Sequence, residues 1–371
     1  MPPIPAHVWP RPVAKLRGAI DMHPDWQQFL ERQGAHFEDV DGVPGVAAFD
    51  GPAPCMQPEL ADLSPLGQLR IEGPEAAKFF QGYATCDLRD VAPDRAIPGA
   101  LCSREGRTIA TFRVWGAPDA LTLRLHRDLI VPVRDLLARF IVFSKAELVE
   151  PGDSTVGLGL IGDGAEAMVA EICGAAPEPG EAITSGPADA PHVAIRNRGE
   201  RARFEIWMSV ASAPEIWRQL AHRCRPIPWS RWAAHRIRAG YIELSPRTAG
   251  EYVPQALNLQ ANGLISFKKG CYLGQEVVAR TQHLGKLKKR MYRFSIAGSE
   301  GGTPALGSPV RRQEPEGDKV GEVVAAAYDA GRCELLAVVR MDAVDSPLFV
   351  GRHALVLEEL PYDVPALSAR G

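Results

Sequence analysis

Cys271 is the residue whose type and neighbours point most directly to chemistry, within the stretch Lys268-Lys-Gly-Cys-Tyr-Leu-Gly-Gln-Glu276. The flanking glycines, Gly270 and Gly274, allow a sharp turn and the close approach of another group. Two lysines precede the cysteine, and the run Gln275–Arg280 predicts a helix that begins just after it. Positive charge and a helix N-terminus both favour the thiolate, the form in which cysteine acts as a nucleophile or metal ligand. The competing interpretation is a buried cysteine that packs as a small hydrophobe, and the residues alone leave both open.

The chain has seven cysteines, none within four residues of another: Cys55, Cys86, Cys102, Cys173, Cys224, Cys271 and Cys333. This spacing excludes CxxC redox and zinc-ribbon motifs. An odd, scattered set favours a reducing cytoplasm over a disulfide framework. A metal held by this chain alone is therefore not expected, whereas iron or a cluster shared with a partner through the Cys271 thiolate stays open.

Positive charge is concentrated next to this cysteine. From Lys268 to Arg293 eight residues are basic and one, Glu276, is acidic, so the segment carries +7 and the rest of the chain −10. Such a surface suits an anionic ligand or partner, and a solvated basic segment is the alternative. His283 is a candidate base for the thiol, although a solvated histidine is the commoner case.

The composition is that of a globular protein, with 371 residues, 46% of them hydrophobic and 23% charged. No run approaches the roughly 20 apolar residues of a membrane span, so no membrane association is expected. Residues 1–21 hold five prolines and lack the apolar core of a secretory signal. We expect them to be a disordered extension, with Met22 as an alternative start.

Residues 22–287 alternate strand and helix patterns. After a helix at His23–Gln33 and an irregular Pro/Gly-rich stretch to about residue 60, the first block is predicted as a strand (Leu66–Glu72), a helix (Glu75–Gln81), a hairpin (Ile97–Ser103 and Arg107–Trp115), a strand (Ala120–His126), a helix (Asp128–Phe140) and a strand (Val142–Val149). The second block has a strand (Thr155–Ile161), a helix (Gly164–Ile172), a hairpin (Val193–Arg196 and Arg203–Val210) and two helices (Pro214–Arg223 and Trp229–Ala239). Two blocks of one design predict a duplicated α+β unit.

Beyond Lys288 the helical patterns end. Short predicted strands follow at Met291–Ile296, Pro309–Arg312, Val320–Tyr328, Cys333–Arg340 and His353–Leu357. They predict a C-terminal antiparallel β-barrel over residues 288–371. The predicted fold class is therefore α+β, with the boundary at residues 285–290.

Several motifs, in this order, resemble those of one family: Phe79-Phe-Gln-Gly82 with Thr85-Cys-Asp87, Glu105-Gly-Arg107, Phe140-Ile-Val-Phe-Ser-Lys145, Val253-Pro-Gln-Ala-Leu-Asn-Leu259, Gly263-Leu-Ile-Ser-Phe-Lys-Lys269 and Lys269-Gly-Cys-Tyr-Leu-Gly-Gln-Glu276 followed by Val277-Val-Ala-Arg280. They resemble the YgfZ-type folate-binding proteins, relatives of the glycine-cleavage T-protein (an aminomethyltransferase) that assist iron–sulfur cluster assembly. The resemblance implies a duplicated α+β folate-binding unit and a β-barrel around a channel for tetrahydrofolate or a derivative.

By resemblance Cys271 is the functional thiol. The positive charges of Lys268, Lys269 and Arg280 are expected to favour its thiolate form. The implied folate-binding residues are Trp232, Arg107, Lys269, Gly270, Tyr272, Gly274, Gln275, Glu276 and Arg280. Trp232 would stack on folate, and a core position on an amphipathic helix is its alternative. Leu66 stands where some relatives carry a second aromatic residue, which puts one stacking contact in doubt.

Two departures bear on whether the protein is an enzyme. Related aminomethyltransferases carry an acid after the glycine of the Ser103–Thr108 loop, where this chain has Arg107, and another acid at the position of Arg238. Folate one-carbon transfer needs groups that relay protons, and Glu105, before the glycine, is displaced from the required place. We therefore predict a cytoplasmic folate-binding protein that assists assembly or repair of iron–sulfur clusters. A tetrahydrofolate-dependent aminomethyltransferase or demethylating enzyme is the alternative.

The implied partners are folate, iron–sulfur assembly proteins and client [4Fe–4S] enzymes, including radical enzymes that thiolate tRNA. The basic run from Lys286 to Arg293 is expected to hold the folate glutamate tail or an acidic partner. Direct tRNA binding is not expected, because a single short basic stretch with only Tyr292 and Phe294 interleaved offers few phosphate contacts.

Overall fold

The computed structural model describes residues 22–51, 58–150, 154–187, 189–199, 201–285, 287–298 and 302–364. The predicted extension at residues 1–21, Cys55 and Lys286 lie outside the described residues. Within the described ranges no helix is long and apolar enough to cross a membrane.

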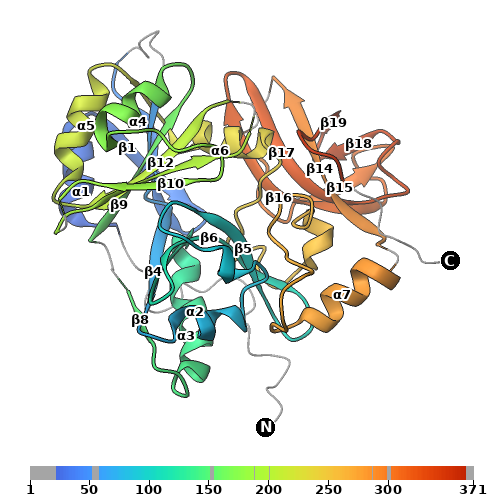
Figure 1. Ribbon diagram of the computed structural model, residues 1–371. Coiled ribbons are helices and arrows are strands. Elements are labelled where there is room, and N and C mark those ends of the chain that lie inside the picture. The colour runs from blue at the N-terminus through green and yellow to red at the C-terminus, as the bar shows by residue number, and fades with distance from the viewer. Residues whose placement is uncertain are drawn as a thin grey trace.

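A five-stranded antiparallel sheet in the order β5-β6-β7-β4-β8 forms the lower part of the molecule in Figure 1. Its strands are β4 (Leu66–Glu72), β5 (Ile97–Cys102), β6 (Thr108–Ala117), β7 (Ala120–His126) and β8 (Glu147–Val149), with α2 (Ala76–Gln81), α3 (Ile130–Ile141) and the short helices η1 (Leu88–Asp90) and η2 (Arg127–Leu129). The leucines of β7 are buried as their alternation predicts. Arg124 and His126, on the opposite face of β7, are buried as well. This end of the sheet is therefore covered on both faces.

A second sheet has six strands in the order β10-β11-β12-β9-β3-β13. They are β3 (Glu59–Asp62), β9 (Thr155–Ile161), β10 (Ala182–Ser185), β11 (His192–Asn197), β12 (Arg203–Ser209) and β13 (Arg225–Ile227), with helices α4 (Ala165–Cys173) and α5 (Ala213–Ala221). Strand β3 precedes the first sheet in sequence but lies between β9 and β13, antiparallel to the former and parallel to the latter.

The two sheets follow one chain path. The first runs β4-α2-β5-β6-β7-α3-β8 and the second β9-α4-β10-β11-β12-α5-β13. In each sheet the strand that comes last in sequence lies at the edge, on the outer side of the strand that comes first in the repeat. The second differs by the insertion of β3. This shared topology confirms the predicted duplication.

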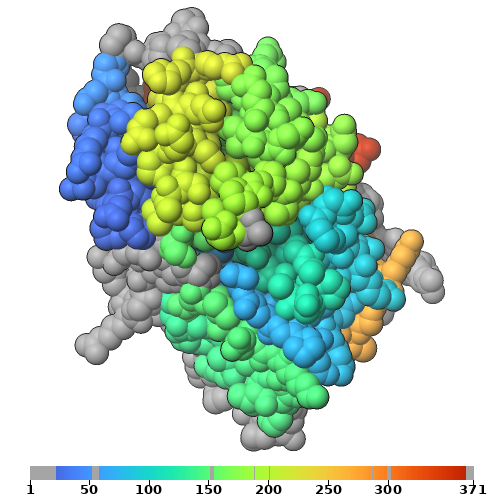
Figure 2. Space-filling model, turned by 60° about the vertical axis from the view of Figure 1, so that its left-hand side comes forward, coloured from blue at the N-terminus to red at the C-terminus, as the bar shows by residue number. Residues whose placement is uncertain are grey.

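Near the N-terminus the predicted helix is present, and a hairpin that the sequence did not indicate follows it. After α1 (Pro24–Arg32), strands β1 (Ala35–Val40) and β2 (Val43–Phe49) make a hairpin, so the prediction of an irregular stretch is wrong here. Its turn, Asp41-Gly42, has positive φ at both residues, which aspartate and glycine tolerate in two-residue hairpins. Figure 2 shows α1, in dark blue, beside the yellow-green α5, where the rings of Trp26 and Trp217 meet edge to face at 5.8 Å.

A second correction concerns the residues after α3. Val142–Val149 was predicted as one strand, but only Glu147–Val149 pairs with β4. Val142 and Phe143 lie in a turn with exposed fractions of 72% and 84%. Their apolar, β-branched and aromatic character favours a strand, and tertiary structure overrides that preference.

The C-terminal residues form a closed six-stranded barrel, at the right of Figure 1, in which all pairs are antiparallel. Its strands are β14 (Lys289–Ala297), β15 (Pro309–Arg312), β16 (Lys319–Asp329), β17 (Arg332–Arg340), β18 (Leu348–Val350) and β19 (His353–Glu358). Closure leaves no unpaired edge strand. The predicted barrel is confirmed, with β18 as an additional strand.

Helix α6 (Trp229–Arg238) lies between the second sheet and the barrel and packs against β2, β3, β16 and β17. The chain then continues through η3 (Pro254–Leu257) to α7 (Gln275–Leu284).

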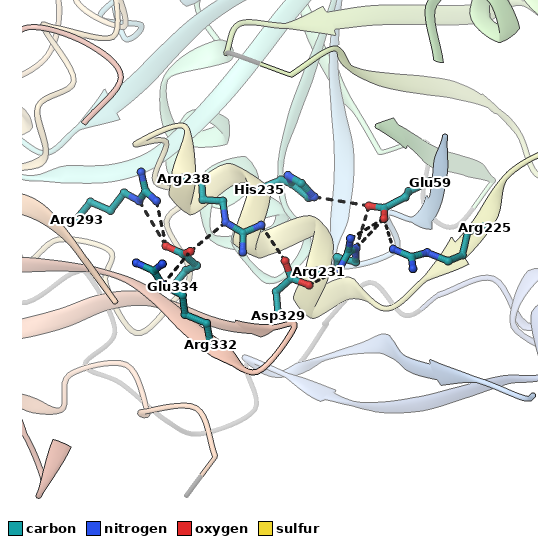
Figure 3. A network of polar contacts seen from close by, with 9 residues as sticks. All are labelled: Glu59, Arg225, Arg231, His235, Arg238, Arg293, Asp329, Arg332 and Glu334. Atoms are coloured by element: carbon teal, nitrogen blue, oxygen red, sulfur yellow. Dashed lines mark hydrogen bonds and ion pairs between the residues drawn. The ribbon is translucent and has the colours of Figure 1, made fainter. Parts of the chain in front are cut away.

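Ion pairs along α6 connect these parts (Figure 3). Arg231 pairs with Glu59 of β3 at 2.7 Å and with Asp329 of β16 at 2.5 Å. Arg238 pairs with the same Asp329 at 2.8 Å and with Glu334 of β17 at 3.0 Å. Each buried carboxylate is therefore shared by arginines, as burial of charge requires.

Replacing Trp217 by alanine should lower the free energy of unfolding by about 3–5 kcal/mol, because the cavity left by a fully buried indole collapses only in part. Phe143→Ala is the matched control, since its exposed ring should change stability by no more than about 0.5 kcal/mol. Denaturant unfolding followed by circular dichroism measures both. Equal losses in the two variants would contradict the assigned packing.

Candidate functional site

Cys271 lies at the surface, in the segment that leads into α7. It is exposed, whereas the other five cysteines that the structure describes are buried. The helix begins at Gln275 with Gly274 as its N-cap, so the thiol precedes the helix, close to the predicted place. Its position lets Cys271 meet a group that another molecule presents.

Lys269 anchors this segment. Its Nζ donates hydrogen bonds to the backbone carbonyls of Gln81, Ala84 and Cys86 at 2.8, 2.6 and 2.8 Å. Three acceptors match the three N–H groups of an ammonium. Burial lowers the pKa of Lys269 to about 8, while the carbonyl oxygens favour the charged form. The side chain predicted to lie beside the thiolate is thus bound to the segment at residues 81–86.

Backbone hydrogen bonds attach both ends of the thiol segment to the same place. Ser266 N–H donates to the Thr85 carbonyl at 2.9 Å, and Leu273 N–H donates to the Gly82 carbonyl at 3.0 Å. The Thr85 hydroxyl donates to the Leu264 carbonyl at 2.6 Å. Two motifs far apart in sequence therefore form one structural unit.

Two glycines let α7 approach the β5–β6 turn. Gly274 has a φ of 81° and lies against the carbonyl of Ser103, where any Cβ would collide. Gly106 has a φ of 69°, and a Cβ there would lie 2.8 Å from Val277. Both positions require glycine for conformation and for space.

The other predicted residues of this region differ in exposure. Gly270, Glu276, Arg280 and Arg107 are exposed, Gln275 is half-buried and Tyr272 is buried. Arg107 donates to the Glu251 carbonyl at 2.9 Å. The Tyr272 ring lies 5.4 Å from Lys269 Nζ. These residues therefore gather on α7, the segment before it and the adjoining turn.

Trp232 has different surroundings. It is 0% exposed, and Gly159 of β9 lies so close to its ring that a Cβ would collide. The Arg203 Cζ lies 5.8 Å from the ring centroid. Trp232 lies in the interior against β9, whereas Cys271 is exposed at the surface. Stacking of Trp232 on folate stays a prediction.

Beside Trp232 lies a group of polar side chains, here called the central polar cluster: Arg113 (β6), Arg124 (β7), Arg203 and Glu205 (β12), Arg236 (α6), Tyr241 and Glu243. Arg124 binds both carboxylates of the cluster. It donates twice to Glu205, at 3.1 and 2.9 Å, and pairs with Glu243. A strand of each sheet and the chain after α6 thus meet at one guanidinium.

Four arginines and two glutamates give the cluster an excess of positive charge. Burial opposes ionisation of Glu205, but Arg124 and Arg113 lower its pKa to about 2, so it is an ionised acceptor at neutral pH. Burial, reinforced by the charges of Arg236 and Arg113, lowers the pKa of Arg203 to about 9. Buried charge without full compensation is costly, so the cluster is suited to a ligand with negative or strongly polarised oxygens.

Unpartnered polar atoms gather in the same place. Several of the buried atoms without a hydrogen-bond partner among the described residues belong to the cluster or to Trp232, and others lie elsewhere in the fold: Arg113 Nε, Arg203 Nε, Arg236 Nε, Glu243 Oε1 and Trp232 Nε1 are those near the cluster. Buried polar groups are paired in the great majority of cases. The cluster therefore holds both donors and an acceptor that the described protein atoms leave without a partner.

Three cavities adjoin the cluster. They measure about 310 Å³ beside Arg236 and Glu243, about 200 Å³ beside Arg203 and about 130 Å³ beside Arg113. The described residues that line the second include no acid, and its basic residues are Arg198, Arg201, Arg203, His235, Arg238 and Arg293. Polar groups that converge on cavities are typical of ligand sites.

Sequence reasoning missed the central polar cluster. Neither Arg124 nor Glu205 is singled out by the sequence patterns. The sequence signal that could have indicated the cluster is a charged residue within an otherwise apolar strand, as in β6, β7 and β12. Glu105, which the sequence places outside the position of the missing acid, is exposed on the β5–β6 turn. No three His, Cys, Asp or Glu side chains form a metal site in the described ranges.

No protein-family model matches the chain. A protein named tRNA-modifying protein YgfZ from Yersinia pestis (strain Pestoides F) is 29% identical over 312 residues, 82% of this chain and 92% of the relative. Its namesake from Escherichia coli O139:H28 is 28% identical over 326 residues, 84% and 98% of the two chains. The solved structure of glycine cleavage system aminomethyltransferase T from Bartonella henselae matches with a TM-score of 0.72 at 15% identity, over 92% of this chain and 98% of that one.

These relatives cover most of both chains, and the solved structure matches all three parts of the fold. The protein is thus a homologue of the YgfZ proteins and has the fold of glycine-cleavage aminomethyltransferase T.

Proposed function

We propose that this protein binds a reduced folate at the central polar cluster and uses Cys271 as the working thiol in assembly or repair of iron–sulfur clusters. Its clients would include enzymes of tRNA modification. The observation that carries the folate site is the set of unpartnered buried polar atoms beside three cavities. The names of the relatives and the shared fold support the same conclusion.

The chemistry of folate fits the cluster. A pterin ring presents N–H donors, which Glu243 Oε1 can accept, and a carbonyl oxygen, which an arginine can bind. The glutamate tail carries carboxylates, for which guanidinium groups are the preferred partners. The cavity of about 200 Å³ supplies these at Arg203 and Arg293, and Arg293 belongs to the basic run predicted to hold the tail.

Because Cys271 is exposed, its thiolate can reach iron or a cluster that is bound to another protein. One thiolate is an incomplete ligand set for iron or a cluster, and the described residues bring no cluster of metal-ligating side chains together. Iron or a cluster bound at Cys271 would therefore take its other ligands from the partner.

Aminomethyl or demethylating transfer is the second candidate, favoured by the shared fold with aminomethyltransferase T. Three observations weigh against it. Glu105 is exposed on its turn, Arg238 is held by Asp329 and Glu334, and Glu205 is an ionised acceptor bound to Arg124. None of these supplies a proton donor at folate nitrogens. Turnover of a methylamine-type donor with tetrahydrofolate would establish the transferase.

Arg203→Met should weaken tetrahydrofolate binding by about tenfold or more, as expected for loss of one charge-assisted hydrogen bond. Isothermal titration calorimetry under anaerobic conditions measures the change. Arg352→Met, exposed on the β18–β19 turn, is the matched control and should leave the dissociation constant unaltered. Equal tetrahydrofolate affinity in both variants would contradict the placement of the folate site at the cluster.

Cys271→Ala should abolish complementation of a strain with low [4Fe–4S] enzyme activity, because it removes the thiolate that attacks or ligates. Enzyme activity and tRNA thiolation are measured at matched protein levels. The variant should still bind tetrahydrofolate, since Cys271 lies outside the central polar cluster. Full complementation by Cys271→Ala would contradict the role assigned to the thiol.

Lys269→Met should lower the free energy of unfolding by about 3 kcal/mol or more, because it leaves buried carbonyls without a donor. It should also raise hydrogen exchange in residues 264–274. Lys268→Met is the control, since Lys268 is exposed one residue away. Identical exchange in the two variants would show that Lys269 does not anchor the segment.

A further inference from the structure

The thiol segment and α7 form one exposed surface, here called the thiol face and made of Phe267, Lys268, Gly270, Cys271, Arg280 and His283, all exposed. Phe267 meets His283 of α7 edge-on, with ring centroids 6.0 Å apart, so the segment and the helix are continuous. Figure 1 shows α7 at the outer edge of the molecule. The face is open to a macromolecule.

Charge on this face is unbalanced. Lys268 and Arg280 of the thiol face, and Lys288 just beyond α7, are exposed and form no ion pair with any described residue. Glu276 is the single acid in the described part of residues 267–289. Exposed cations without partners attract anionic groups and raise association rates. The apolar contribution comes from Phe267, whose side chain is 39% exposed.

The face is also held in a fixed shape. Lys269 and the backbone of Ser266 and Leu273 bind the segment to residues 82–86, while Phe267, Lys268, Gly270 and Cys271 are exposed. A Cβ at Gly270 would meet nothing within 4 Å, so the backbone next to the thiol is approachable. A preorganised surface loses little conformational entropy when a partner docks.

We propose that the thiol face docks an acidic segment of a partner protein, with Phe267 as its apolar anchor and Cys271 at its centre. This rests on the proposed function only in taking Cys271 as the working thiol. Aromatic anchors ringed by polar groups are typical of protein–protein contacts.

A protein fits this face better than an RNA. Three unpaired cations neutralise few phosphates, and the remainder of the chain outside the basic segment carries −10, which repels a long polyanion. A short acidic segment interacts with the basic patch alone.

Two peptides of equal length, one rich in glutamate and one rich in lysine, test the proposal. Each carries one cysteine as a mixed disulfide with thionitrobenzoate. The Cys271 thiolate attacks the peptide sulfur, the protein–peptide disulfide forms, and thionitrobenzoate leaves as a coloured thiolate. At low salt the glutamate peptide should react on the order of tenfold faster. At 1 M salt, where the Debye length is about 3 Å, the ratio should approach one.

Arg280→Glu should reverse the preference, and Phe267→Ser should slow the glutamate peptide, whereas Arg352→Glu on the barrel should match the wild type. Equal low-salt rates for both peptides, or an unaltered ratio in Arg280→Glu, would overturn the proposal. Protection of Cys271 from alkylation by total tRNA, without protection by polyglutamate, would assign the face to RNA and overturn it as well. Tetrahydrofolate binding is measured on the same proteins, so failure of the folate site is seen separately.

Discussion

Burial of charge on α6 is the constraint on which the arrangement of this protein depends. The helix lies between the second sheet and the barrel, and it carries arginines at Arg231, Arg236 and Arg238. The barrel carboxylates Asp329 and Glu334 pair with two of them. Removing one partner from a buried ion pair typically costs about 3–5 kcal/mol, because the remaining charge is uncompensated. The barrel is therefore fixed to the helix by electrostatics as well as by apolar packing.

The other side of α6 is different, and this difference is the basis for the proposed ligand site. There Arg236 lies with the arginines of β6, β7 and β12, and two glutamates do not balance them. On the barrel side the carboxylates are shared among neighbouring arginines; in the central polar cluster several donors have no acceptor within the described chain. A stable fold tolerates such an imbalance where a ligand supplies the missing groups.

Elements with clear periodicity and turn residues were predictable from the sequence. The bounds of β4, β7 and β9 agree with the predicted strands because apolar residues alternate between turns. The cluster was not predictable in this way: Arg124 meets Glu205 and Glu243 across sequence separations of 81 and 119 residues, and a pattern within one strand does not say what covers its second face. Similarly, the sequence shows that Lys269 carries a positive charge near Cys271. It does not show that the side chain binds the carbonyls of residues 81, 84 and 86, which are distant in sequence.

Strand β6 connects the thiol segment with the cluster. Its first residue, Thr108, follows the turn against which Gly274 packs, and Arg113 lies further along the same strand. Five residues of extended chain span about 17 Å, so Arg113 lies well away from the turn on which Gly274 packs. The glycines at Gly106 and Gly274 keep the turn and α7 in contact without intervening side chains. The proposed ligand site at Arg113 and the segment that carries Cys271 are therefore connected through one strand, although the two groups lie in separate places.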